Sequence, residues 1–107
     1  MTTKTKPYRA RNYKDVESFI YNREEFNHGS CSARWYERFE DVDTGLMQFS
    51  DACLLDAAFE RSNSGVFVVR SYETPIAWVV PGEDAVIPDV KYSSTTSRQQ
   101  NICRRYL

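Results

Sequence analysis

Apolar residues recur at helical spacing near the N-terminus, within residues 13–26. The stripe consists of Val16, Phe19, Ile20 and Phe26. Positions three and four apart share one face of a helix, so the pattern predicts an amphipathic helix. Asn12 is its expected N-cap, and Asp15 places a negative charge in the first turn. We expect residues 27–30 to end the helix, with Gly29 at positive φ.

The next segment alternates in polarity from Ala33 to Phe39. Turn residues follow at positions 41–45, and a short apolar stretch occupies residues 46–49. Alternation followed by a turn and an apolar return is typical of a β-hairpin, which we therefore expect over residues 32–49.

A second helical pattern covers residues 51–61. Ser50 is the expected N-cap, and the Asn-Ser-Gly sequence at residues 63–65 stops the helix. The predicted buried face comprises Leu54, Leu55, Ala58 and Phe59.

The last third of the chain predicts three strands, over residues 66–71, 76–80 and 85–92. Turn residues separate them at positions 72–75 and 81–84. The first two strands are almost continuously apolar, which indicates central strands covered on both faces. Pro88 interrupts the third, which suits an edge strand or a bulge because proline cannot donate to the ladder.

A terminal helix follows, and Thr96 and Gln99 have the spacing of a capping box. The face expected to lie on the sheet carries Ile102, Cys103 and Tyr106. The residues turned elsewhere are Arg98, Asn101, Arg104 and Arg105. This outer face is basic.

These elements predict an α+β fold in the order α-β-β-α-β-β-β-α, with a small, mostly antiparallel sheet of about five strands packed with two to three helices. Because 107 residues suffice for one core, we expect a single globular domain over residues 8–107. Residues 1–7 are expected to form a disordered basic arm.

Composition narrows the class of protein. A hydrophobic content of 41% favours a folded globule. No run approaches the roughly 18 apolar residues of a membrane span, and the polar N-terminus lacks the apolar core of a signal peptide. We expect a cytoplasmic protein with no membrane contact. The three cysteines, Cys31, Cys53 and Cys103, are expected to be buried small hydrophobes rather than disulfide or zinc ligands.

The formal net charge of −1 conceals an uneven distribution. Residues 1–14 carry five basic residues and no acidic one, and residues 91–107 carry four and none. Residues 15–90 contain all 15 acidic residues against the other five basic ones. The two basic ends either meet in space as one basic face or simply solvate an arm and a surface helix.

Two segments of the last third carry a family resemblance: SYETPIAWVV at residues 71–80 and VIPDVKYSSTTSRQQ at residues 86–100. A weaker match is FNHGSCSA at residues 26–33. The chain resembles a family of small uncharacterised proteins of actinobacterial phages. The resemblance implies a phage origin and no established activity, catalytic residue or cofactor. The chain departs from the family at Gln99, where His is usual, and over residues 34–64.

Three local patterns resemble chemical sites. His28 and Cys31 could form a nucleophilic pair, but a third orienting group is lacking. The acidic turn beginning at Asp41 does not fit a calcium loop, because Leu46 and Ala52 stand where that loop needs Gly and Glu. The hydroxyl residues 93–97 before Arg98 could bind an anion; the capping box already accounts for them and is favoured.

The leading hypothesis is a non-catalytic phage accessory protein that binds a host or phage macromolecule, most simply a protein. The acidic, unmatched middle segment would then be the variable recognition surface. The alternative is nucleic-acid binding through the basic arm and terminal helix. Its candidate residues are Arg98, Arg104, Arg105, Lys91, Arg9 and Arg11. Enzymatic activity ranks last, and no metal or cofactor is expected.

Overall fold

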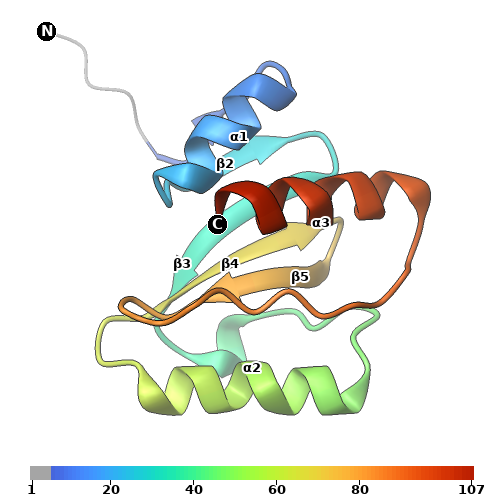
Figure 1. Cartoon of the computed structure of the whole chain (residues 1–107). Helices are drawn as coiled ribbons and strands as arrows, with labels where there is room; N and C mark the ends of the chain where they lie inside the picture. Colours follow the sequence, from blue (N-terminus) through green and yellow to red (C-terminus); the bar gives the residue numbers. More distant parts are fainter. Residues whose placement is uncertain (1–5) are drawn as a thin grey trace, which may run out of the picture.

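A computed structural model describes residues 6–107. Within this range the chain forms three α-helices, one 3₁₀ turn and one five-stranded sheet (Figure 1). The elements are β1 (Tyr8–Arg9), α1 (Tyr13–Tyr21), β2 (Phe26–His28), β3 (Cys31–Tyr36), η1 (Phe39–Asp41), α2 (Phe49–Arg61), β4 (Val66–Ser71), β5 (Thr74–Val79) and α3 (Ser94–Tyr106). The predicted α+β class is confirmed.

The strands lie in the order β1-β2-β3-β4-β5. β1 runs parallel to β2, and every other neighbouring pair is antiparallel. The β3–β4 pair is the longest ladder, with Cys31 opposite Ser71 and Tyr36 opposite Val66. The register shifts between Val69 and Arg70, where β4 pairs with β5, so that Pro75 is accommodated beside a bulge.

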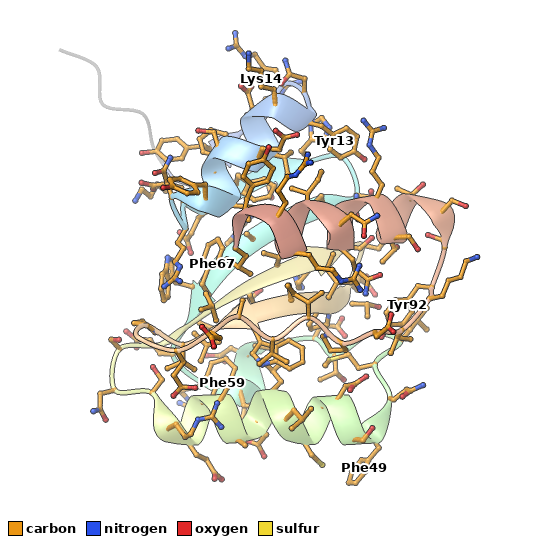
Figure 2. All side chains as sticks on the ribbon, viewed as in Figure 1. Tyr13, Lys14, Phe49, Phe59, Phe67 and Tyr92 are labelled. Carbon is orange, nitrogen blue, oxygen red and sulfur yellow. The ribbon has the colours of Figure 1, made fainter. Side chains whose placement is uncertain are left out.

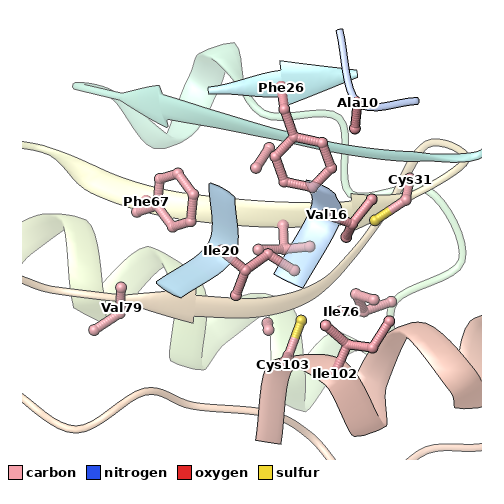
Figure 3. Close-up of a cluster of buried hydrophobic side chains, with 13 residues drawn as sticks. Ala10, Val16, Ile20, Phe26, Cys31, Phe67, Ile76, Val79, Ile102 and Cys103 are labelled. Atoms are coloured by element: carbon pink, nitrogen blue, oxygen red, sulfur yellow. The ribbon is translucent and has the colours of Figure 1, made fainter. Parts of the chain in front are cut away.

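Helices cover both faces of the sheet (Figure 1). α1 and α3 lie side by side on one face, and α2 covers the other. Buried side chains accordingly form two clusters, one beneath each layer. Figure 3 shows the first, in which Val16 and Ile20 of α1 and Cys103 of α3 surround strand residues. Every residue of β5, and all of β4 except Arg70, is buried, as the near-continuous apolar runs predict. Only β4 is central, because β5 is the last strand of the sheet.

α1 begins where its sequence indicates. Asn12 is the N-cap, and its Oδ1 accepts the backbone N–H of Asp15 at 2.9 Å. Val16 and Ile20 are fully buried. The predicted end was too late: the helix stops at Tyr21, and Phe26 belongs to β2. Gly29 does have positive φ, but in the turn between β2 and β3.

The predicted hairpin over residues 32–49 is wrong in its pairing. β3 does form, but its neighbours are β2 and the distant β4. Residues 46–48 are irregular and lead into α2. Pairing with β4 places Cys31 and Ala33 in a fully buried cluster, which a local hairpin with the exposed Leu46 could not provide.

The third predicted strand, over residues 85–92, is also wrong. This segment runs past β5 but makes only one bridge, between Trp78 and Val86. Pro88 removes a donor in the middle of the segment. The fifth strand of the sheet is instead β1, at the opposite edge.

The starts of two helices were misplaced by a few residues. α2 begins after Gln48 rather than after Ser50. Its predicted buried face is only half correct, because Leu55 and Ala58 are buried whereas Leu54 is 54% exposed. α3 is capped by Ser93, not Thr96. The expectation that all cysteines are buried fails at Cys53, on the exposed side of α2.

Candidate binding groove

A hollow of about 840 Å³ opens where the β4–β5 turn meets the loop before α2 and the start of α3. The backbone N–H of Tyr72, in the β4–β5 turn, donates to the Ser30 carbonyl in the β2–β3 turn. We call this hollow the turn-end groove. Its lining residues are Asp43, Gly45, Leu46, Ser71, Tyr72, Glu73, Thr74, Tyr92, Ser93 and Thr96.

Tyr72 stands at the rim of the groove in an unusual backbone conformation. Its φ is 54°, in the left-handed region that a bulky residue seldom adopts. The two-residue turn between Ser71 and Thr74 imposes this conformation, because β4 must reverse directly into β5. Burial of the ring does not offset this backbone strain, because the residue is 67% exposed.

A loop from before α2 forms the second side of the groove. Its Gly45 lies against the β4–β5 turn, where an added Cβ would come within 2.8 Å of the Glu73 carbonyl oxygen. The next backbone N–H, that of Leu46, donates to Thr74 Oγ1 at 2.9 Å. This contact leaves the Leu46 side chain 76% exposed beside the groove.

The third side is the start of α3, where hydroxyl groups bond to one another. The backbone N–H of Thr96 donates to Ser93 Oγ at 3.1 Å. Thr96 Oγ1 also lies 2.9 Å from Ser71 Oγ and 3.1 Å from Ser93 Oγ. The hydroxyl residues of this segment thus cap α3 and fasten it to β4, as the capping interpretation expects, although the capping residue differs.

Gln99 and Gln100 are both buried, and neither belongs to a capping box. Gln99 Nε2 donates to Ser30 Oγ at 2.9 Å, and Gln100 Nε2 donates to the Pro88 carbonyl at 3.2 Å. Gln99 and Gln100 therefore attach α3 to the β2–β3 turn and to the extended segment.

The groove is acidic. Asp43 and Glu73 line it, and no basic residue does. Tyr92 also lines it, and partial burial together with the nearby Asp51 carboxylate raises the pKa of the Tyr92 phenol. Figure 2 shows Tyr92 at the end of the molecule where α2 starts with the exposed Phe49.

The structure brings together only some of the predicted basic residues. Arg98 and Arg105 border one shallow hollow on the α1–α3 face, with Glu17 beside them. The Arg98 guanidinium carbon lies 4.0 Å from the centre of the Tyr13 ring. Arg104 Nη2 is 3.7 Å from Asp89 Oδ1.

The remaining predicted basic residues lie elsewhere. Arg9 and Arg11 border a different hollow, beside His28. Arg11 Nε is 3.4 Å from Asp15 Oδ2. Lys91 is exposed next to Tyr92 in the extended segment. Part of this charge is therefore compensated locally.

His28 and Cys31 face each other across the β2–β3 pair but do not form a reactive couple. His28 Nδ1 lies 3.0 Å from the Ala10 carbonyl. Burial raises the pKa of the Cys31 thiol to about 12, which keeps it protonated and poorly nucleophilic. Over residues 6–107 no three His, Cys, Asp or Glu side chains come together in a way that could hold a metal ion.

A family model described as a family of unknown function (DUF8033) matches residues 10–103. The chain belongs to this family. The matched span contains every residue of the turn-end groove, whereas Arg9, Arg104 and Arg105 lie outside it. No curated protein and no solved structure matches the chain. None of the helices formed by residues 6–107 has the length and hydropathy needed to cross a membrane.

Sequence patterns did not point to the groove. Leu46 lies in a stretch whose pattern predicts the return strand of a hairpin, and residues 72–75 are expected only as a turn between strands. One signal was available: a tyrosine at position 72, in a turn where glycine or asparagine is usual.

Proposed function

We propose that this protein is a non-catalytic binding protein whose partner is another protein, engaged at the turn-end groove. The observation that carries the proposal is the exposure of large apolar side chains around a groove. Leu46 is 76% exposed and Tyr72 is 67% exposed, and both line the groove. Phe49, three residues after Leu46, is 85% exposed. Grouped exposed apolar residues are typical of protein interaction sites.

The middle of the chain contributes directly to this surface. Asp43 and Leu46 belong to the acidic middle segment, whereas Tyr72 and Tyr92 belong to the last third of the chain. The sequence resemblance supports the further proposal that the chain is a phage accessory protein with a host or phage protein as partner.

Affinity capture with matched variants tests the proposal. Leu46→Asp places a charge in the groove, and Tyr21→Asp places the same charge at another exposed apolar site, on α1, where Tyr21 is 70% exposed. We expect a protein partner that the wild type and Tyr21→Asp retain and that Leu46→Asp loses at least tenfold. Equal retention by both variants would contradict the proposal.

Nucleic-acid binding is the second candidate, and one observation favours it: α1 and α3 lie together, so that Arg98 and Arg105 share one surface with an aromatic ring beneath Arg98. Nuclease treatment before the capture separates the two candidates. A bound partner that disappears with nuclease, with added salt and on neutralising Arg98, Arg104 and Arg105 would favour nucleic acid.

A further inference from the structure

The charges around the turn-end groove are unbalanced and unpaired. Asp43 and Glu73 line the groove, and across residues 6–107 neither carboxylate takes part in an ion pair. Asp43 Oδ1 accepts the Gly45 backbone N–H at 2.8 Å, and this contact holds the Asp43 side chain in the loop beside the groove. A third carboxylate, that of Asp51, is close enough to Tyr92 to help raise the pKa of its phenol.

The start of α3 is the positive feature that could oppose these carboxylates. A helix N-terminus is equivalent to about half a positive charge, and Ser93 already caps this one. Two full negative charges outweigh it. The field in the groove therefore favours a cation over an anion.

Apolar surface accompanies the negative charge. Leu46 and the rings of Tyr72 and Tyr92 line the same groove. Aromatic faces attract cations, and the long methylene stems of Lys and Arg pack on apolar surface while the charged end reaches polar groups. A side chain with an apolar stem and a cationic end complements both properties of the groove.

We propose that the turn-end groove takes an arginine or lysine side chain from the partner protein. The stem lies against Leu46 and the tyrosine rings, and the cation reaches the Asp43 and Glu73 carboxylates. This inference rests on the proposed protein-binding function and adds the chemical class of the residue recognised.

Capped pentapeptides that differ only in the central residue test the inference. The peptides have the form acetyl-Gly-Ser-Xaa-Ser-Gly-amide, with Xaa as arginine, lysine, citrulline, norleucine or glutamate. The readout is the amide spectrum of the ¹⁵N-labelled protein. We expect the arginine and lysine peptides to shift Gly45, Leu46 and Glu73 saturably, with citrulline and norleucine at least fivefold weaker and no response to glutamate.

Charge-matched variants separate the groove from the overall acidity of the protein. The double variant Asp43→Asn with Glu73→Gln removes both groove carboxylates. It should weaken binding of the arginine peptide about tenfold, because charge-assisted contacts are lost. Asp56→Asn with Glu60→Gln removes two exposed carboxylates of α2 and should leave binding unchanged. Equal weakening by both double variants would overturn the inference.

Each remaining outcome tests either the inference or the proposed function on which it rests. Equal binding of the citrulline or norleucine peptide would make the groove merely apolar, and preferential binding of glutamate would make it an anion site; either overturns the inference. A partner lost on Leu46→Asp but retained by Asp43→Asn with Glu73→Gln would also overturn it while leaving protein binding intact. A partner unaffected by either change would instead contradict the proposed function.

Discussion

Tyr72 combines backbone strain with solvent exposure. Its φ of 54° places a bulky residue in the left-handed region, and its side chain remains 67% exposed. Strained backbone conformations concentrate at functional sites. Its position at the rim of the turn-end groove is consistent with a role in recognition.

Replacing Tyr72 with glycine should therefore separate stability from binding. Glycine adopts positive φ without strain, so we expect Tyr72→Gly to raise the free energy of unfolding by about 1 kcal/mol. The same change removes a ring from the groove and should weaken partner or peptide binding at least threefold. Urea unfolding and the peptide titration measure the two effects.

Arg23 provides the matched control, because its φ is also 54° and it does not line the groove. Arg23→Gly should stabilise the fold by a similar amount and leave binding unchanged. A Tyr72→Gly variant that is both less stable and fully competent in binding would contradict the assignment.

At the scale of elements, the groove depends on how a loop rests on a turn. Gly45 allows the 43–46 loop to contact the β4–β5 turn, and the Leu46 N–H donates to Thr74 Oγ1. This hydrogen bond joins residues that are 28 positions apart in the sequence. Local sequence patterns therefore could not have predicted it.

We expect Gly45→Ala to destabilise the protein by about 1–3 kcal/mol, because the new Cβ would overlap the turn backbone. Gly82→Ala is the control: its φ of 86° is also positive, but an added Cβ there meets nothing within 4 Å. Each substitution lowers the free energy of unfolding by some amount. The difference between these two losses isolates the packing effect at Gly45, because both variants share the cost of positive φ. Equal losses in the two variants would show that the loop does not press on the turn.

The element scale also shows where local patterns succeed. Asn12 caps α1 as its side chain indicates, because capping depends on neighbours three residues away. The capping box at Thr96 and Gln99 fails because tertiary contacts use these side chains differently. Thr96 bonds to Ser71 on β4, and Gln99 bonds to Ser30 in the β2–β3 turn.

At the scale of the whole molecule, two cores separated by one sheet hold the fold together. Cys31 and Cys103 lie in the core beneath α1 and α3, whereas Cys53 is exposed. Burial raises the pKa of both core thiols. Their ionisation is therefore linked to global unfolding.

We expect the protein to lose stability as the pH rises above about 9. The ordinary thiol pKa is 9.0, and that of Cys31 in the folded protein is about 12. Between these values the unfolded chain releases a proton that the folded protein keeps, so the contribution is complete below pH 9.0 and is lost toward about 12. Urea unfolding across this range measures it.

Cysteine variants isolate this contribution from the other groups that titrate at high pH. Cys31→Ala should show a shallower decline than the wild type, because one of the linked thiols is gone. Cys53→Ala should decline as steeply as the wild type, since that thiol is exposed in the folded protein as well. Identical slopes in all three proteins would contradict the linkage.

Local sequence patterns predict the helices, the two buried strands β4 and β5 and the α+β class. These follow from local periodicity, from caps and from near-continuous apolar runs, which act over a few residues. Long-range packing sets the pairing of β3 with β4, the single bridge made by residues 85–92, and the contact of α1 with α3. It also decides that Asp43, Leu46, Tyr72 and Tyr92 share a groove, because burial couples residues without regard to their separation in sequence.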